Sequence, residues 1–299
     1  MKLLVSSWPH IRDKITTREV MMAVVIALLP ATAFGVWSFG LHALLIVITS
    51  ITTAVITEFV AFKLMGKEPT RDGSAVVTGL LLALTLPPTL PLWTAAVGAA
   101  FAISIGKFAF GGLGRNIFNP ALVGRAFLSI SWPALMITWV IPGTATTTAT
   151  PLTGTTISNA NLFIGNVAGS LGEVSKFAIL IGGLYLIVMK YIDWRTPLFY
   201  IGTVGVLTLA LGQDPIFHML AGGLFLGAFF MATDYVTTPM TSRGRIIFAV
   251  GGGSLVVAIR LFGGLPEGVA YSILIMNAFT PLIERYTRPK VYGTGKVKK

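Results

Sequence analysis

The feature that most constrains this chain is a series of long apolar runs, separated by short segments that carry most of its charged residues. Only 11% of the residues are charged, whereas soluble domains usually carry about 25%. Several runs approach the ~20 residues that a helix needs to cross the hydrocarbon core of a bilayer. The pattern predicts an all-α polytopic membrane protein that lies in the lipid bilayer.

Ten apolar runs qualify as candidate membrane helices in a single membrane domain spanning residues 1–299. The third run is short and ends in Leu86-Pro87-Pro88, and consecutive prolines end a helix. We therefore expect about ten transmembrane helices with a broken third helix. The runs lie near residues 20–37, 42–63, 74–86, 92–110, 117–140, 173–189, 197–211, 216–233, 246–262 and 267–283.

Lysine and arginine alternate in their placement between successive runs, which predicts the orientation of the chain. The loops near residues 38–40, 88–91, 141–172, 212–214 and 263–266 contain neither residue. The other loops and both terminal segments are basic, so we expect both termini to be cytoplasmic, in a prokaryotic inner membrane. The basic residues are Lys2, Arg12, Lys14 and Arg18, then Lys63, Lys67 and Arg71, then Lys107 and Arg115, then Lys190 and Arg195, then Arg243 and Arg245, and those of the tail from Arg285 to Lys299.

An odd number of helices in each half inverts the second half relative to the first, as in many transport folds. The Gly/Leu-rich segment 79–88 resembles segment 223–239, and both end in polar, proline-containing sequence, which predicts a broken eighth helix as well. We expect a cytoplasmic arm (1–19), a first five-helix repeat (20–140), an external loop (141–172), a second repeat (173–284) and a basic cytoplasmic tail (285–299). The alternative is that glycine and proline are simply frequent in membrane helices.

The formal net charge of +11 does not indicate nucleic-acid binding, because the basic residues lie at the ends of apolar runs. Cysteine is absent, which excludes disulfides and cysteine-ligated iron–sulfur clusters in this chain. A redox cofactor would be organic, or a haem held by histidine or methionine. Only His10, His42 and His218 are available, and histidines at helix ends are usually ordinary interfacial residues.

Asn116 and Asn119 lie in the segment FGGLGRNIFNPA at the start of the fifth run. Asn116 is expected to cap the helix, and Asn119 to lie one turn inside it, where its amide needs a partner. Such an amide can bind another helix or a ring with donors and acceptors, and the spacing alone favours helix packing.

Arg125 and Arg260 are arginines inside apolar runs, where they either reach toward the membrane surface or bind an anionic group such as a phosphate. Arg260 has Glu267 or Asp214 as alternative partners. Carboxylates inside apolar runs are often cation or proton sites, or else they pair with basic residues at the boundary such as Lys63, Arg71 or Arg243. These carboxylates are Glu58, Asp72 and Asp234.

The external loop contains GTATTTATPLTGTT at residues 143–156, in which eight of fourteen residues are threonine and none is charged. It is a flexible connector, a glycosylated spacer, or a neutral surface for a membrane or a large planar ring. The composition does not distinguish among its threonines.

The chain resembles the RnfD/NqrB family, whose members belong to the Rnf complex and to the sodium-pumping NADH:quinone reductase. The resemblance covers nearly the whole membrane region. It is carried by TG at 78–79 with LTLPPTLPLW at 84–93, FGG at 110–112, NIFNPA at 116–121, RAFL at 125–128, MATD at 231–234, EGVAY at 267–271 and MNA at 276–278.

The resemblance implies two five-helix halves similar to urea-transporter-like folds. It also implies a flavin mononucleotide (FMN) joined through its phosphate to a threonine in an external loop by a flavin transferase. The family motif, a Ser or Thr and a small residue before Ala-Thr-Pro-Leu, matches TTATPL at 147–152, so Thr150 is the expected attachment point. Family members often carry Asp six positions earlier, where this chain has Thr144, so Thr147, Thr148 and Thr153 are alternatives.

The family further implies a noncovalent riboflavin between the helices, nearer the cytoplasm. On this basis Asn116, Asn119, Arg125, Arg260 and Asp234 are the expected cofactor-binding residues, beside the covalent site at Thr150.

The resemblance implies electron transfer between reduced ferredoxin and NAD, coupled to Na⁺ or H⁺ translocation, with the other Rnf subunits as partners. The chain would carry electrons through flavins and would not be catalytic alone. Its short N-terminal arm favours the Rnf type over the NqrB type. The alternative from another class is a flavin-free, urea-transporter-like solute channel, because fold alone does not identify function.

Overall fold

The computed structural model describes residues 15–68, 72–142, 147–148, 158–165, 167–263 and 268–289. In the described chain, four helices are long and apolar enough to cross a membrane: α1(Thr17–Phe39), α2(Leu41–Leu64), the stretch Leu92–Phe110 that begins with α4(Leu92–Ser104), and α12(Ser242–Phe262). The remaining elements are shorter. The expected class, an all-α membrane protein, is confirmed at this level.

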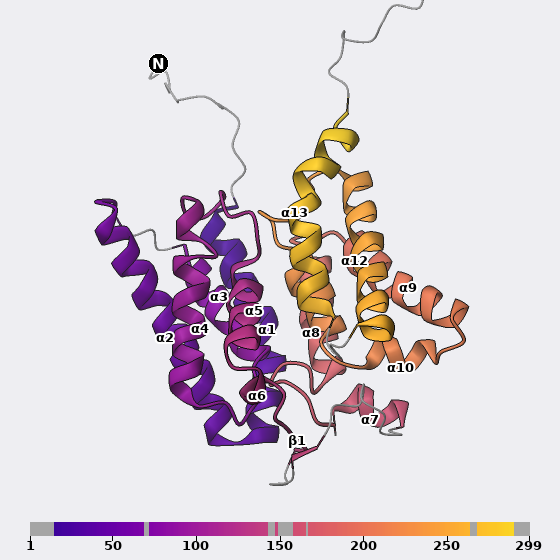
Figure 1. Cartoon of the computed structure of the whole chain (residues 1–299). Coiled ribbons are helices and arrows are strands. Elements are labelled where there is room, and N and C mark those ends of the chain that lie inside the picture. The colour runs from indigo at the N-terminus through magenta and orange to yellow at the C-terminus, as the bar shows by residue number, and fades with distance from the viewer. Residues whose placement is uncertain are drawn as a thin grey trace, which may run out of the picture.

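The helices form two groups that lie side by side (Figure 1). The first half contains α1, α2, α3(Ser74–Leu84), α4, the short turn η1(Phe108–Phe110), α5(Pro120–Ser131) and α6(Pro133–Met136). The second half contains α8(Lys176–Val188), α9(Arg195–Ala210), α10(Pro215–Leu220), α11(Leu224–Leu226), η3(Gly227–Met231), α12 and α13(Val269–Thr287). Between the halves in sequence lie the strand pair β1(Trp139–Val140) and β2(Thr147–Thr148) and the helix α7(Asn159–Ile164).

Helix α1 begins and α13 ends at one end of the molecule, here called the terminal end, whereas α6, α7 and β1 lie at the opposite β1 end (Figure 1). Local sequence explains the helix limits. Thr16 and Glu19 form a capping box at the start of α1, and Gly40, with φ of 77°, separates α1 from α2.

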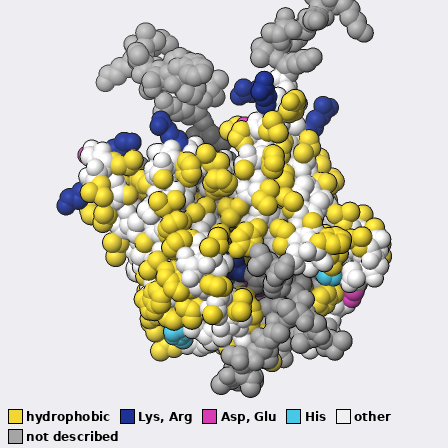
Figure 2. All heavy atoms as spheres, in the orientation of Figure 1, with side chains coloured by type: hydrophobic (Ala, Val, Ile, Leu, Met, Phe, Trp, Pro, Cys, Tyr) yellow, Lys and Arg dark blue, Asp and Glu magenta, His cyan; other side chains and the backbone are white. Residues whose placement is uncertain are grey.

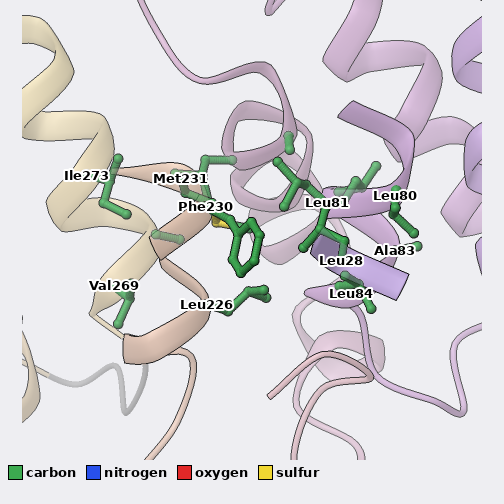
Figure 3. Packing of buried hydrophobic residues seen from close by; sticks show 14 of the residues in the cluster. Leu28, Leu80, Leu81, Ala83, Leu84, Leu226, Phe230, Met231, Val269 and Ile273 are labelled. Carbon is green, nitrogen blue, oxygen red and sulfur yellow. The ribbon is translucent and has the colours of Figure 1, made fainter. Parts of the chain in front are cut away.

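The two halves meet where α1 packs against α8 and where α5 packs against α13. At Gly182 of α8, a Cβ atom would lie 1.8 Å from the carbonyl oxygen of Ala27 in α1. Only glycine allows this backbone approach, as at other close helix crossings in membranes. Phe230 of the second half faces Leu28 and Leu81 of the first half in the shared core (Figure 3).

The structure can be compared with three of the expected runs. The third and eighth are interrupted as expected, whereas the fifth differs. The third is short, because α3 ends at Leu84, before the two prolines. The eighth divides into α10, α11 and η3, and Gly222, with φ of 67°, lies at the interruption. The expected single helix at residues 117–140 is wrong, because Trp132 leaves the helical conformation immediately before Pro133, after which α6 and β1 follow.

Large apolar side chains are exposed on α1, α2, α9 and α12, and apolar side chains cover much of the face seen in Figure 2. In α2 these include Ile48, Ile56 and Phe59. Exposed apolar surface of this extent belongs against lipid or partner helices. The chain is therefore a multi-pass membrane protein.

Candidate functional site

Two pockets lie between the halves. The first, here called the Asn116 pocket, lies where α3, the turn before α5 and η3 approach one another. It brings together Asn116, Asn119 and Asp234, three residues from the expected binding set. Its lining also includes Met21, Val24, Ser74, Val77, Thr78, Leu81, Lys107, Leu186, Phe229, Phe230, Thr233 and Tyr235.

The asparagines have different roles from those expected. Asn119, not Asn116, caps α5: its Oδ1 accepts hydrogen bonds from the backbone N–H groups of Ala121 (3.1 Å) and Leu122 (3.4 Å). The expectation for Asn116 is wrong because Pro120 fits the first position of a helix and makes Asn119 the residue that precedes α5. Asn119 is also linked to the second half, since its backbone N–H donates to Asn277 Oδ1 at 3.4 Å.

Asn116 therefore has a side chain that does not cap α5. It is 5% exposed, and its Nδ2 donates to the carbonyl of Phe118 at 3.2 Å. Its Oδ1 is buried and has no hydrogen-bond partner among the described residues. A buried acceptor without a partner costs about 1–3 kcal/mol, so this oxygen is suited to accept an N–H from a bound molecule.

A buried charged network forms one wall of the same pocket. Lys107 Nζ bonds to Glu58 Oε1 and, at 2.6 Å, to Ser74 Oγ, which in turn donates to Asp72 Oδ1 at 2.5 Å. Lys107 is 2% exposed. The described partner of Glu58 is Lys107, from the end of the α4 stretch, and not Lys63 or Arg243, whereas Arg71 lies outside the described residues.

The charge pattern predicts Lys107 in a cytoplasmic loop, and the structure shows that its side chain, in the turn after α4, is buried. A signal is present in the sequence: Lys107 falls inside the apolar run 92–110, and an ionisable residue inside such a run is a candidate functional residue. The partner of Lys107 could not be read from the sequence, because Glu58 lies 49 positions away.

Asp234 follows η3, and its Oδ2 accepts a hydrogen bond from Thr237 Oγ1 at 2.9 Å. The η3 segment is a π-helical turn, in which Ala232 N–H donates to the carbonyl of Gly227 at 2.7 Å. Such turns are often found at functional sites. Here η3 supplies Phe229 and Phe230 to the Asn116 pocket and Met231 to the second pocket.

The second pocket, here called the Arg125 pocket, brings together Arg125 of α5 and Arg260 of α12, two residues that nothing in the sequence links. Glu173, before α8, also lines this pocket and was not among the expected residues. The other lining residues are Thr85, Leu122, Gly223, Leu226, Met231, Val269 and Ala270.

The polar groups around the Arg125 pocket are held by short contacts. Arg260 Nη1 and Nη2 donate to the carbonyls of His218 (2.6 Å) and Ala221 (2.8 Å) at the end of α10. Glu173 Oε1 accepts from Ser170 Oγ at 2.5 Å, and its backbone carbonyl accepts from the buried Lys176 Nζ at 2.5 Å. The guanidinium of Arg260 therefore fixes the interrupted end of α10 to α12.

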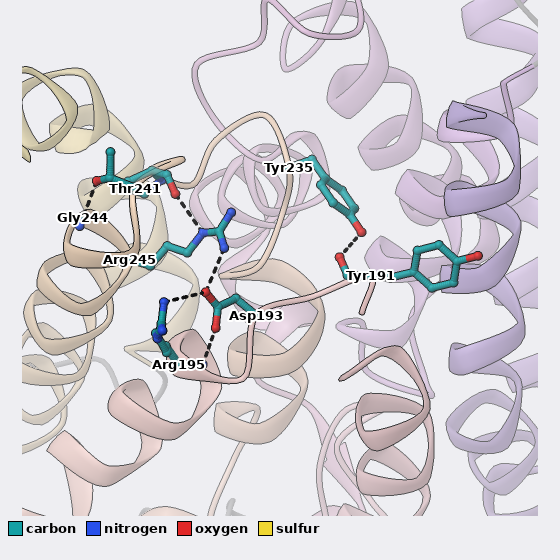
Figure 4. Close-up of polar contacts among 8 residues, drawn as sticks. Tyr191, Asp193, Arg195, Tyr235, Thr241, Gly244 and Arg245 are labelled. Atoms are coloured by element: carbon teal, nitrogen blue, oxygen red, sulfur yellow. Dashed lines mark hydrogen bonds and ion pairs between the residues drawn. The ribbon is translucent and has the colours of Figure 1, made fainter. Parts of the chain in front are cut away.

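A third hollow, the Tyr191 groove, lies between the α8–α9 turn and the segment that precedes α12, and it shares Thr233, Asp234 and Tyr235 with the Asn116 pocket. Tyr235 Oη donates to the carbonyl of Tyr191 across the groove (Figure 4).

Asp193 in this groove accepts from Arg245 Nη1 at 2.9 Å and from the backbone N–H of Arg195 at 3.0 Å (Figure 4). Burial acts to raise the pKa of the Asp193 carboxyl. The hydrogen bonds and charges of the two arginines outweigh burial and hold that pKa below its ordinary value.

The expected residue for covalent attachment, Thr150, lies outside the described residues, as do His10 and Glu267. His42 Nε2 bonds to the carbonyl of Leu90 at 3.0 Å, so this nitrogen donates and is not a metal ligand. Within the described ranges, no group of three or more metal-ligating side chains occurs. The candidate site consists of the Asn116 pocket and the Arg125 pocket, each lined by apolar and polar side chains.

Comparison with known proteins gives a match along almost the entire chain. The model of the NQR2, RnfD, RnfE family matches residues 4–293. The D component of the Na(+)-translocating ferredoxin:NAD(+) oxidoreductase complex of Acetobacterium woodii is 52% identical over 100% of this chain and 98% of its own length. The proton-translocating counterpart of Clostridium ljungdahlii is 49% identical over 97% of this chain and 96% of its own length.

A more distant relative is similar over the same length. The D component of the ion-translocating oxidoreductase complex of Methanosarcina acetivorans is 42% identical over 97% of this chain and 96% of its own length. Similarity of this extent leaves no large segment of either protein unmatched. The chain belongs to the NQR2, RnfD, RnfE family.

Proposed function

We propose that this chain is the RnfD component of an Rnf-type membrane complex, which transfers electrons between reduced ferredoxin and NAD and couples that transfer to Na⁺ or H⁺ translocation. The observation that carries the proposal is the full-length match to relatives that are named as this component. Their names differ in the ion, so either ion fits the chain. The other subunits of the complex are its partners, and the chain is not catalytic alone.

The chain crosses a prokaryotic inner membrane with its terminal end in the cytoplasm. Lysine and arginine gather at that end, and apolar side chains cover the flanks (Figure 2). This distribution supports the orientation, because cytoplasmic segments are enriched in basic residues. The threonine-rich loop, which follows β1, then lies on the outer face.

The helices are arranged as two inverted five-helix repeats. In the first half α4 packs against α2 and α5, and in the second half α12 packs against α9 and α13. Each half also has an interrupted element, at the end of α3 and between α10 and η3. Interrupted helices at corresponding places in two repeats commonly form the binding site between them.

Riboflavin is the noncovalent ligand of the Asn116 pocket, and the donor set fits it. A flavin ring has an N–H group that can donate a hydrogen bond to the buried Asn116 Oδ1, and carbonyl oxygens that can accept one from the remaining N–H of Lys107. Leu81, Phe229 and Phe230 supply apolar walls for the ring faces. Bound flavin would supply reversible uptake of one or two electrons, while these residues orient it and keep water out.

FMN is attached to the threonine-rich loop through a phosphoester with Thr150, made by a flavin transferase. The strand pair places Thr148, two residues before Thr150 in the sequence, opposite Trp139. Arg125 and Arg260 are the charged groups that suit a phosphate or a reduced flavin ring on this side of the molecule. The threonine oxygen would bond to the phosphorus of FMN in a flavin dinucleotide donor, the phosphoanhydride bond to the second nucleotide would break so that it leaves as a nucleoside monophosphate, and the hydroxyl proton would be released.

The test is purification of the complex through a tag on this chain, followed by an assay of ferredoxin-dependent NAD reduction. We expect partner subunits to co-purify and the activity to disappear when the chain is deleted. A chain that purifies alone, colourless, and moves a solute across vesicles by itself would instead support the solute channel.

The attachment site is tested on the same preparation. We expect an acid-stable fluorescent band on a denaturing gel, with a flavopeptide mass on Thr150, that disappears in Thr150→Ala. Thr153→Ala is the matched control and should retain the band. A flavopeptide on another threonine, or an unmodified loop in protein from its native cell, contradicts the assignment.

A further inference from the structure

The buried ion pair of Lys107 and Glu58 points its lysine toward the Asn116 pocket and its glutamate away from it. Lys107 lines the pocket, whereas Glu58 lies behind it on α2 and is not part of the lining. The pair therefore presents its positive end to whatever occupies the pocket. Ser74, which accepts the second hydrogen bond from Lys107, holds the ammonium group in this position.

A cation fixed beside a redox ring alters the ring's reduction potential. Reduction adds negative charge, which a nearby ammonium group stabilises and a nearby carboxylate destabilises, and the effect is large where water is excluded. Lys107 is 2% exposed, and Glu58 is 7% exposed. The charges are therefore poorly screened by solvent.

One carboxylate faces the same pocket as this cation. Among the described residues, Lys107 is the basic side chain of the lining and Asp234 is the acidic one. Loss of Lys107 would leave a ring in the pocket beside Asp234, with Glu58 behind the wall.

We propose that Lys107 is the positioning residue that sets the reduction potential of the noncovalent flavin in the Asn116 pocket, with Glu58 limiting its effect. This inference rests on the proposed function, because it requires a flavin in that pocket. It assigns the ion pair a role beyond stability: the lysine makes the flavin easier to reduce, and the glutamate restrains that change. The balance of the two effects sets the reduction potential of this flavin relative to the potentials of its electron donors and acceptors.

The test uses the full chain in detergent, produced without the flavin transferase so that riboflavin is the flavin measured. A redox titration followed by flavin absorbance gives the midpoint potential of the wild type and each variant. We expect Lys107→Met to make reduction at least about tenfold less favourable, which is a fall of about 59 mV for a one-electron step. Glu58→Gln should change the potential in the opposite direction, and Lys107→Arg should leave it near the wild-type value.

The double variant Lys107→Met with Glu58→Gln is the control for folding, because replacing both partners of a buried pair is better tolerated than replacing one. We expect its potential to lie between those of the single variants. A purely structural pair would give shifts of the same sign, or none, in both single variants.

Equal potentials in the wild type and Glu58→Gln, with riboflavin retained, would overturn the inference even where Lys107→Met does not fold. Wild-type chain that binds no riboflavin would overturn the flavin proposal for the pocket, and this inference with it. The two failures are distinguished by the flavin content of the wild type.

Discussion

The Asn116 pocket and the Arg125 pocket lie between the same two halves and share η3 as a wall, yet they differ in charge. Of the described side chains that line the first pocket or bond to its lining, Glu58, Asp72 and Asp234 are acidic and Lys107 is basic. Around the second, Arg125, Arg260 and Lys176 are basic and Glu173 is acidic.

Under the proposed function, this difference in charge suits the two pockets to two separate flavins. The Asn116 pocket has large apolar walls and a buried carbonyl oxygen that fits the edge of an uncharged ring. The Arg125 pocket has guanidinium groups that fit a phosphate or a reduced ring. The interface between the same two halves thus contains two chemically distinct pockets. A substitution in one pocket should leave ligand binding in the other unchanged.

The largest expected effect is on the buried pair behind the Asn116 pocket. Glu58→Ala leaves the Lys107 ammonium buried without its carboxylate and should destabilise the chain by about 3–5 kcal/mol. Thermal unfolding in detergent measures this. Glu284→Ala on α13, whose carboxylate accepts a hydrogen bond from Met240 in an exposed setting, is the control and should cost much less. Equal losses in both variants would contradict a buried role for Glu58.

The next largest effect is expected from a substitution that disrupts the Arg125 pocket. Arg260→Gln removes the charged donors to the carbonyls of His218 and Ala221, and hydrogen bonds from charged groups contribute about 1.5–3 kcal/mol each. We expect a lower melting temperature and less acid-stable flavin, with extractable flavin unchanged. Arg243→Gln, at the start of α12, is the matched control. Loss of extractable flavin in Arg260→Gln would show that the pockets are not independent.

A smaller effect is expected at the ligand contact of the Asn116 pocket. Asn116→Leu removes the buried acceptor, and an unpaired ligand N–H costs about 1–3 kcal/mol, or roughly 5- to 150-fold in riboflavin affinity. Equilibrium dialysis measures the affinity, and the exposed Asn161→Leu is the control. Unchanged affinity in Asn116→Leu would remove Asn116 from the binding site.

The smallest effect concerns the half-exposed ion pair of the Tyr191 groove. Asp193→Asn should cost about 1 kcal/mol or less at neutral pH, because Arg245 and Arg195 remain in contact with solvent. The folded pKa of Asp193 is depressed, so its contribution is present above the ordinary pKa and is lost as the pH falls through the lower folded pKa. Melting curves of wild type and variant should converge in acid. A difference that grows in acid would contradict this sign.

Part of this architecture could be predicted from the sequence, because local chemistry determines it. The pair Pro87-Pro88 limits α3, and the glycines after Phe217 accompany the interrupted eighth run. The sequence pattern places the start of α5 one turn early, because both Asn116 and Asn119 are good caps and only Pro120 decides between them.

The residues that line each pocket together could not be predicted from the sequence, because their proximity depends on how the two halves pack against each other. Arg125 and Arg260 are far apart in the chain and meet only when α5 and α12 are in place. Lys107 and Glu58 each lie inside an apolar run, but they belong to different helical segments, and the sequence does not show that they pair. Charge placement predicts sides of the membrane, but it does not reveal which charges are buried together.

The most direct test of the account is a count of acid-stable and extractable flavin in purified wild type, Thr150→Ala and Asn116→Leu. We expect both kinds in the wild type, loss of only the acid-stable flavin in Thr150→Ala, and loss of only the extractable flavin in Asn116→Leu. Wild-type protein without flavin, or loss of both kinds together in either variant, would contradict two separate flavin sites in this chain.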